Sequence, residues 1–250
     1  MGRDDVQNNW QFYWIRHKDT ITSSEKASPI FFEINKIVKE IRNKKYLECG
    51  SGIGEISITI AEEGGTVYML DTSIEALKIS EKFFSDRKLS GNFIHASIFD
   101  IPFENNLFDV VWNAGVLEHF KFDDQVTAIK EMSRVCKNDG LIITFNPYSK
   151  AIFYRIGKFF AEKKGVWEFG EEYPVKTFKK QTEVLNLEIV NEYSFFFEPQ
   201  ITFIKYASNM LFYVIKFLYK LTGKVGEYIW KYFFGGYLLV TIIKKRNMLD

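Results

Sequence analysis

Only two cysteines, five prolines and three histidines occur in this chain of 250 residues. The thiols of Cys49 and Cys136 cannot complete a four-ligand zinc site, and no CxxC pair is present, so we expect a reducing compartment. Few prolines, with 46% hydrophobic and 26% charged residues, exclude a disordered chain, a collagen-like repeat and a disulfide scaffold. A chain of this length and composition can form one α/β unit with a small insertion.

The sequence also has no apolar run long enough to cross a bilayer, which takes about 20 residues. Residues 201–219 are strongly apolar, but Lys205 and Lys216 interrupt them and leave residues 206–215 as the longest uncharged run. A second apolar stretch, residues 232–243, is also too short and contains a glycine pair. The first nine residues are polar and contain no apolar signal segment, so we expect a cytoplasmic protein.

Charged and aromatic residues are unevenly distributed, although the net charge is only +1. Residues 1–148 hold 17 Lys and Arg against 22 Asp and Glu, a balance of −5, whereas residues 149–250 hold 16 against 10, a balance of +6. Many of the 25 Phe, 13 Tyr and 5 Trp fall in the basic second part. A basic, aromatic-rich segment raises the question of a membrane or a lipidic partner.

Short apolar runs alternate with helical patterns through the first 146 residues. We predict strands at 46–49, 66–70, 92–95, 108–112 and 141–145, and helices at 29–43, 54–63, 73–87 and 123–136. This alternation indicates βαβ units, a parallel sheet and therefore a Rossmann-like α/β fold. Beyond residue 146 the alternation stops, and we predict helices at 149–164, 177–186 and 200–221 and strands at 187–197 and 237–244.

The most specific local pattern is LECGSGIG at residues 47–54, between a predicted strand and a predicted helix. Glycines at such a turn let the backbone approach a ligand, and the helix N-terminus supplies free N–H groups. The dinucleotide fingerprint places its last small residue three positions beyond the second glycine, where this chain has Glu55, so a nicotinamide oxidoreductase is disfavoured. Asp71 ends the next strand, 17 residues beyond Gly54, where a carboxylate can accept both hydroxyls of a ribose.

Three further signatures follow in order: IPFENNLFDVV at residues 101–111, GVLEHF at 115–120 and RVCKNDG at 134–140. Together with residues 47–54 and Asp71, they resemble class I S-adenosylmethionine-dependent methyltransferases of the small-molecule type known as type 11. The resemblance covers roughly residues 44–146. It implies a seven-stranded, mostly parallel sheet with helices on both faces and an antiparallel last strand. It also implies S-adenosylmethionine as the cofactor and S-adenosylhomocysteine as its product.

The resemblance further implies how this cofactor is held. The matching positions are Glu48, Gly50, Ser51, Gly52 and Gly54 for the methionine portion, Asp71 for the ribose, and Thr72, Ser97 and Ile98 for the adenine. Many relatives carry Asp where this chain has Ser97. A serine hydroxyl still accepts a hydrogen bond from the adenine amine, although a weaker one than a carboxylate accepts.

Two residues near the end of the fourth predicted strand are candidates for the chemistry. Methyl transfer to a weakly acidic acceptor needs close alignment and a proton acceptor. His119 stands beside the expected sulfonium and is the candidate base, with a structural histidine bonded to a loop carbonyl as the alternative. Asn113 would orient the acceptor, contact the sulfonium side of the cofactor, or cap the following turn. Because Gly115 replaces the first glutamate of an E-x-x-E-H metal cluster, we expect no metal site.

The N-terminal aromatic residues are candidates for a cover over the acceptor, because the N-terminal segment often covers the active site in this fold. The candidate cap residues are Trp10, Tyr13, Trp14, His17 and, after the fifth strand, Tyr148. Docking of this segment onto the sheet is the alternative. We expect one methyltransferase domain over residues 1–250: an N-terminal cap at 1–43, a core at 44–148, helical insertions at 149–186 and 198–235, and closing strands at 187–197 and 236–246.

The predicted helices beyond residue 149 are basic and apolar on nearly every other side. Residues 200–246 contain eight Lys and Arg against one acidic residue, Glu227. Such helices can cap the core, form a lid over a hydrophobic acceptor or a dimer face, or rest in a membrane interface. Nucleic acid is a disfavoured partner, because the basic residues are interleaved with large aliphatic side chains and do not form a polar groove.

The sequence therefore predicts methyl transfer from S-adenosylmethionine to a small hydrophobic or aromatic acceptor at oxygen, nitrogen or carbon. Two alternatives remain open: methylation of RNA or tRNA, and a non-catalytic protein that keeps the cofactor fold. Fold alone does not choose the acceptor. A monomer and a homodimer are both compatible with the sequence, as is peripheral contact with a membrane.

Overall fold

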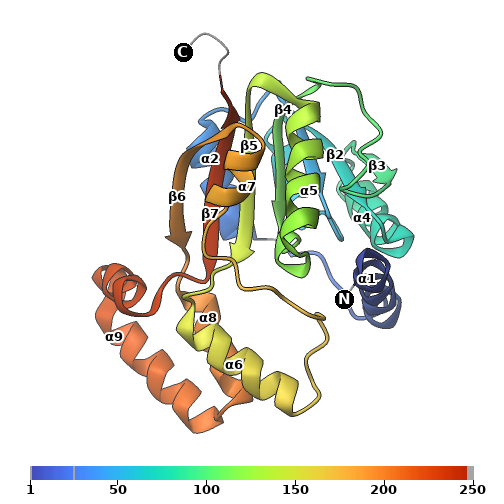
Figure 1. Ribbon diagram of the computed structural model, residues 1–250. Coiled ribbons are helices and arrows are strands. Elements are labelled where there is room, and N and C mark those ends of the chain that lie inside the picture. Colours follow the sequence, from blue (N-terminus) through green and yellow to red (C-terminus); the bar gives the residue numbers. More distant parts are fainter. Residues whose placement is uncertain (1, 25, 247–250) are drawn as a thin grey trace.

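A seven-stranded sheet forms the centre of the computed structural model, which describes residues 2–24 and 26–246 (Figure 1). The strands are β1 (Lys45–Cys49), β2 (Thr66–Asp71), β3 (Asn92–His95), β4 (Phe108–Ala114), β5 (Cys136–Pro147), β6 (Leu187–Phe195) and β7 (Leu238–Lys245). Their order is β3-β2-β1-β4-β5-β7-β6. The strands β1 to β5 pair in parallel, and β7 lies antiparallel between β5 and β6. The expected mostly parallel sheet with an antiparallel last strand is confirmed.

The helices cover both faces of this sheet and form a further layer beyond its edge. They are α1 (Arg3–His17), α2 (Pro29–Val38), α3 (Glu55–Glu62), α4 (Ile74–Asp86), α5 (Phe122–Val135), α6 (Ile152–Lys163), α7 (Lys179–Val184), α8 (Glu198–Phe203) and α9 (Asn209–Phe234), with 3-10 turns η1 (Leu117–His119) and η2 (Ile204–Tyr206). One hydrophobic core lies between the sheet and α5 with α7, and the other lies between the sheet and α2, α3 and α4. Burial on both faces explains the nearly unbroken apolar runs of the central strands.

The sheet positions the functional site because all its strands except β7 end at the same edge. In Figure 1 this is the lower edge, and α1, α6 and α8 lie around it. Parallel sheets bind ligands outside the carboxyl ends of their strands, where the loops leave for the helices. The loops that follow β1, β2, β3 and β4 therefore meet at one place.

The first helix, α1, is a difference from the sequence analysis, which expected a cap but no helix there. Val6, Trp10, Tyr13 and Trp14 share one side of this helix, but the exposed Phe12 and Ile15 lie off that side and obscure the helical pattern in the sequence. Of the side chains of α1 only Val6 is buried. The next helix, α2, begins as expected, with the Ser28 hydroxyl accepting a hydrogen bond from the N–H of Ile30 and proline at the first position. It ends at Val38, earlier than predicted, because Lys39 takes a left-handed φ of 67° and turns the chain.

The helical layer beyond the sheet corrects one prediction. A single helix was expected at 200–221. Instead, α8 and η2 end at Tyr206, and a new helix, α9, begins after Ser208. The Ser208 hydroxyl caps α9 by accepting a hydrogen bond from the N–H of Leu211. Helix α9 then continues to Phe234 and bends at Gly223, which has φ 56° and ψ −153°. The layer has a small core of its own, formed by Phe153, Phe197, Ile201, Ile204, Phe212 and Ile215.

None of the helices within residues 2–24 and 26–246 is long and apolar enough to span a membrane.

Candidate functional site

A cavity of about 470 Å³ lies at the carboxyl ends of β1, β2, β3 and β4. The sequence-predicted residues that line it are Trp10, Tyr13, Trp14, Glu48, Gly50, Ser51, Gly52, Asp71, Thr72, Ser97, Ile98 and His119. This volume is in the range of small-molecule sites, which run from about 300 to 1,000 Å³. The structure therefore brings the polar residues of four loops and the aromatic residues of α1 around one space.

The glycine loop between β1 and α3 forms one wall of the cavity. Gly50, Gly52 and Gly54 all have left-handed φ values, of 72°, 52° and 69°. A Cβ at position 52 would lie 2.8 Å from the indole ring of Trp14, and one at position 50 would lie 2.5 Å from a methyl carbon of Val116. Both the conformation and the space therefore require glycine at these two positions.

Asp71 ties this loop to the end of β2. Its Oδ2 accepts a hydrogen bond from the N–H of Gly52 at 2.7 Å, and its Oδ1 accepts one from the N–H of Ser73 at 2.8 Å. Burial raises the pKa of the carboxyl, and the two N–H groups oppose that shift by stabilising the ionised form. Each carboxylate oxygen can accept more than one hydrogen bond, so Asp71 keeps acceptor capacity toward the cavity that it lines.

Glu48 and Ser51 place further polar groups on the same wall. The Glu48 carboxylate is buried, its Oε2 accepts a hydrogen bond from the Ser57 hydroxyl at 2.5 Å, and burial raises its pKa to about 8. The buried Ser51 hydroxyl has no hydrogen-bond partner among the described residues. Buried polar groups are normally satisfied, so this hydroxyl and this carboxyl mark a place where a polar ligand fits.

The opposite wall consists of Thr72, Ser97 and Ile98, as the resemblance implied. The Ser97 hydroxyl accepts a hydrogen bond from the N–H of Phe99 at 3.3 Å, which fixes the loop after β3. The imidazole of His95 lies with Nε2 3.0 Å from the carbonyl oxygen of Thr72. This histidine therefore supports the wall from outside and does not line the cavity.

His119 lines the cavity and is almost completely buried. Its Nδ1 lies 2.9 Å from the backbone carbonyl oxygen of Glu171, and because a carbonyl only accepts, Nδ1 carries a proton. In the neutral ring Nε2 therefore holds the lone pair; it lies 3.9 Å from Oε1 of Glu118. The two expected alternatives for His119 therefore occur together: the ring bonds to a loop carbonyl and also lines the cavity.

A buried polar cluster behind His119 is a feature that the sequence analysis missed. Glu118 accepts a hydrogen bond from the side-chain amide of Asn146 at 2.7 Å, and burial raises its pKa. Glu172 accepts a hydrogen bond from the hydroxyl of Tyr154 at 2.6 Å and pairs with Arg155 at 3.3 Å. These groups come from β5, α6 and the loop before α7, so no local sequence pattern predicts that they meet.

Helix α1 covers the cavity through Trp10, Tyr13 and Trp14. The Trp10 ring meets the ring of His119 edge-on, with centroids 5.6 Å apart, and lies 6.0 Å from that of Phe169. Ion pairs fasten both ends of the helix, from Arg3 to Asp124 and from Arg16 to Glu168. Of the two expected arrangements, a cover over the acceptor or a segment docked on the sheet, the helix takes the first, with Trp10, Tyr13 and Trp14 lining the cavity.

Four of the predicted site residues do not line the cavity. The Asn113 side chain is fully buried with its amide nitrogen 3.4 Å from the sulfur of Met132, so its position gives no support to a role in orienting the acceptor or the cofactor. His17 faces Glu168, and Tyr148 packs against the core beside α5 and α7. Gly54 begins α3 and packs against Ser80 and Met69.

Several apolar residues of the cavity were not predicted. They are Val6, Ile30, Ile53, Ile56, Phe99, Val116, Phe120 and Phe169. Phe99 and Phe120 stack edge-on at 4.8 Å, and the guanidinium of Arg3 lies 4.0 Å above the ring of Phe99. Apolar residues in loops resemble core residues in the sequence, so only the three-dimensional arrangement reveals them.

Among residues 2–24 and 26–246, no three or more His, Cys, Asp or Glu side chains form a group that could hold a metal ion.

The cavity fits S-adenosylmethionine by the chemistry of its walls. Left-handed glycines leave room where a Cβ would collide, a buried carboxylate ends β2, and the Ser51 hydroxyl and the Glu48 carboxyl face a space of sufficient volume. A nucleoside needs an acceptor for its ribose hydroxyls, and a cationic amino acid portion favours a carboxylate. Each requirement has a residue in the expected place.

A family model described as a methyltransferase domain matches residues 47–144. Among curated relatives, an uncharacterised protein of Methanocaldococcus jannaschii is 35% identical over 117 residues, 46% of this chain and 47% of that protein. A demethylmenaquinone methyltransferase of Geobacillus is 34% identical over 106 residues, 41% of this chain and 44% of that protein. The chain spans about half the length of the curated relatives it matches.

Solved structures share the fold over most of the chain. Magnesium protoporphyrin IX methyltransferase ChlM of Synechocystis PCC 6803, solved with bound S-adenosylhomocysteine, superposes with a TM-score of 0.64 and 12% identity, over 98% of this chain and 100% of that chain. The [4+2]-cyclase SpnF superposes with a TM-score of 0.63 and 12% identity, over 95% and 93%. At such identity the likeness shows the fold alone. Together with the family model, it confirms the resemblance to class I S-adenosylmethionine-dependent methyltransferases.

Proposed function

We propose that this chain, whose residues 47–144 match the methyltransferase-domain family, transfers a methyl group from S-adenosylmethionine to a small aromatic acceptor. The observation that carries the proposal is the meeting of the glycine loop, Asp71 and Glu48 with aromatic side chains around one cavity. The first group suits the cofactor and the second suits a flat apolar molecule.

Different residues of the chain would bind different parts of the cofactor. Asp71 would accept hydrogen bonds from the ribose hydroxyls, Ser97 and the backbone of Ile98 would contact the adenine, and Glu48 would balance the positive charge of the methionine portion. When bound, S-adenosylmethionine supplies an activated methyl group on a sulfonium sulfur. The glycine loop holds the methionine portion close to the backbone, and α1 excludes water from above.

The acceptor side of the cavity is apolar and aromatic. Val6, Trp10, Phe99, Phe120 and Phe169 line it, and His119 is the titratable side chain among them. A planar ring stacks favourably against such side chains, each ring pair being worth about 1 kcal/mol beyond its buried area. The acceptor is therefore a ring system of low polarity and not a sugar or an amino acid.

His119 is suited to remove a proton from such an acceptor. The bond from Nδ1 to the Glu171 carbonyl fixes the ring and leaves the lone pair on Nε2 in the neutral form. A hydroxylated ring becomes a better nucleophile at oxygen, or at the adjacent carbon, as its hydroxyl proton leaves. Several of the curated relatives are named demethylmenaquinone methyltransferases, which supports a hydroxylated aromatic ring as the first acceptor class to test.

A methyl-transfer assay tests the proposal. The protein is incubated with S-adenosylmethionine labelled in the methyl group and with separate pools of hydroxynaphthalenes and reduced quinones, small amines and carboxylic acids, and tRNA. We expect label in the hydroxylated aromatic pool. Label only in tRNA would contradict the proposal and favour RNA methylation. S-adenosylhomocysteine binding without label in any pool would favour a non-catalytic cofactor-binding protein.

A further inference from the structure

The outward side of α9 exposes a continuous apolar surface. Half of the large hydrophobic side chains that are exposed in the described part of the chain lie on this one helix. We define the α9 outer face as Met210, Leu211, Tyr213, Val214, Phe217, Leu218 and Leu221. Phe217 is 62% exposed, although contact of its apolar ring with water is unfavourable in free energy. Contiguous apolar surface of this kind marks a site of association.

Helical geometry makes these seven residues one surface. At 3.6 residues per turn they occupy roughly 160° of the helix circumference. The opposite side carries Phe212, Ile215 and Tyr219, which pack into the small core with α6 and α8. The helix is therefore already anchored on one side, and its outer face is available for a second apolar environment.

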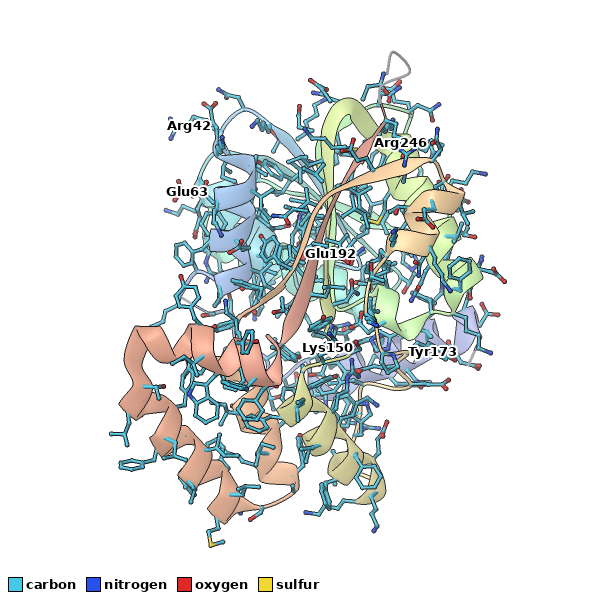
Figure 2. The ribbon with its side chains drawn as sticks, turned by 60° about the vertical axis from the view of Figure 1, so that its left-hand side comes forward. Arg42, Glu63, Lys150, Tyr173, Glu192 and Arg246 are labelled. Atoms are coloured by element: carbon cyan, nitrogen blue, oxygen red, sulfur yellow. The ribbon has the colours of Figure 1, made fainter. Side chains whose placement is uncertain are left out.

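Neighbouring helical turns expose further apolar side chains. Beyond the bend at Gly223, the second part of α9 exposes Tyr228, Ile229, Tyr232 and Phe233, with Tyr232 84% exposed. Helix α6 exposes Ile152, Ile156 and Phe159, spaced four and three residues apart on one stripe. Figures 1 and 2 show α6 and α9 together below the sheet, with α9 at the outside of the molecule.

Positive charge flanks this surface and negative charge is nearly absent. Lys216 and Lys220 are exposed on α9 beside the α9 outer face, and Lys205 is exposed in η2. Glu227 is the only acidic residue between positions 200 and 246, and its carboxylate accepts hydrogen bonds from the N–H of Phe197 at 2.9 Å and the hydroxyl of Tyr219 at 2.6 Å. A surface with an apolar centre, tyrosines and lysines matches the order of layers in an anionic membrane interface.

We infer that the α9 outer face docks on a bilayer containing anionic lipids, with the helix lying in the interface plane. A second copy of the chain is a poorer occupant, because a two-fold contact places the same surface on both sides. The lysines of one copy would then meet those of the other, and the face offers no exposed carboxylate between residues 200 and 246 to receive them. Anionic headgroups supply the missing negative charge.

The docking has a consequence for the cavity, and this consequence rests on the proposed function. The loop from α6 to α7 carries Phe169, which lines the cavity, so the helical layer continues directly into the cavity wall. Docking would then hold the cavity near a bilayer in which an apolar ring acceptor dissolves. The docking itself concerns only the α9 outer face and is tested without any activity.

Vesicle flotation tests the docking. The wild-type chain is mixed with vesicles of phosphatidylcholine alone and with vesicles containing about a quarter phosphatidylglycerol, at about 100 mM and about 500 mM NaCl. We expect flotation with the anionic vesicles that weakens at high salt, and little with the neutral ones. Flotation that is equal for both vesicles and independent of salt would overturn the inference, as would its absence.

Paired variants place the binding on the α9 outer face. Phe217→Glu with Leu221→Glu, and separately Lys216→Glu with Lys220→Glu, should each lower the vesicle partition coefficient at least about tenfold. The matched controls are Phe32→Glu with Val184→Glu, at residues 60% and 64% exposed on α2 and α7, and Lys82→Glu with Lys130→Glu. We expect the controls to bind as wild type. Equal losses in variants and controls would overturn the assignment.

Two further measurements check that the variants are folded and whether the chain forms dimers. Thermal unfolding checks that the variants are folded, which exposed positions should permit. Sedimentation velocity reports the oligomeric state of the wild type and of the Phe217→Glu, Leu221→Glu variant. A wild-type dimer that this variant dissociates, with no vesicle binding, would show that a second copy covers the face and would overturn the inference.

Discussion

The cavity buries polar side chains that are usually exposed, whereas the α9 outer face exposes apolar side chains that are usually buried. Around the cavity, the carboxyl groups of Glu48 and Asp71 are buried, and burial raises the pKa of each. On α9, large apolar side chains such as Phe217 stand in solvent. Each arrangement costs free energy in the isolated protein, because one removes ionisable groups from water and the other leaves apolar groups in it.

The comparison shows two kinds of specificity in one chain. A cofactor site needs particular atoms at particular distances, so it uses left-handed glycines and a carboxylate with assigned hydrogen bonds. A membrane-docking face needs only composition, curvature and charge, so many sequences would serve. The cofactor site is therefore recognisable in the sequence as a motif, whereas the docking face is visible only as an apolar helix of ambiguous role.

The sharpest test of the comparison lies within α9 itself. Phe212 is 4% exposed and packs in the small core, whereas Phe217 is 62% exposed one and a half turns later. We expect Phe212→Ala to lower the free energy of unfolding by about 3 kcal/mol and Phe217→Ala to change it by less than about 0.5 kcal/mol. Urea unfolding measures both. Similar losses in the two variants would mean that the α9 outer face is covered in solution.

The second test concerns the glycine loop. Gly52 and Gly165 have similar left-handed φ values, 52° and 68°, but a Cβ at position 165 has nothing within 4 Å. Both valine variants carry a backbone strain of about 1 to 3 kcal/mol, while only Gly52→Val also fills space beside Trp14.

The affinity for S-adenosylhomocysteine, measured by calorimetry, should fall at least about 100-fold in Gly52→Val. It should stay within about threefold of wild type in Gly165→Val. Comparable losses in the two variants would show that strain alone matters and that the loop does not touch the ligand.

A third test separates chemistry from binding on the two sides of the cavity. We expect His119→Ala to lower kcat on a hydroxylated aromatic acceptor by about 10- to 100-fold, because it removes the proton acceptor. The affinity for S-adenosylhomocysteine should stay within about threefold. His119→Gln keeps a polar side chain and should rescue folding but not kcat. A wild-type kcat in either variant would make the histidine structural.

The smallest expected effect is a pH dependence carried by Glu48. Burial holds its pKa at about 8, so the carboxyl is protonated below that pH in the free protein. The positively charged amino group of S-adenosylhomocysteine favours the ionised form, and binding therefore releases a proton. The affinity should rise severalfold between pH 6 and pH 8 and then level off.

Calorimetry in two buffers of different ionisation enthalpy counts the protons released. The Glu48→Gln variant has no carboxyl to ionise and should bind more weakly with no such rise. A pH profile in Glu48→Gln that matches the wild type would assign the effect to another group.

The parts that sequence reasoning predicted are those whose chemistry is local. The glycine loop, Asp71 and the alternation of strands and helices lie within short segments, and their backbone requirements are written in residue type. Helix α1 was not predicted as a helix, because the exposed Phe12 and Ile15 obscure the spacing of Val6, Trp10, Tyr13 and Trp14 on the side that faces the cavity. The chain breaks between α8 and α9 at Ser208, which caps α9. Because Ser208 lies within an apolar run, the sequence did not indicate this break.

The rest of the site depends on contacts between distant segments. The bond between Asn146 and Glu118 joins residues 28 positions apart, and the bond between His119 and Glu171 joins residues 52 apart. Asn113 was a candidate because it ends a strand at the correct edge, but its side chain points to Met132 and not to the cavity. The direction of one side chain at a strand end depends on the register of the sheet, which only the structure supplies.

The most direct test of the central claim is the binding of S-adenosylhomocysteine to the wild type, to Asp71→Ala and to Asp100→Ala. Asp71 lines the cavity, whereas Asp100 is exposed on the loop after β3 and does not line it. We predict one binding site per wild-type chain, at least about tenfold weaker binding in Asp71→Ala, and unchanged binding in Asp100→Ala. Equal affinity in all three proteins, or none in the wild type, would contradict the assignment of this cavity to the cofactor.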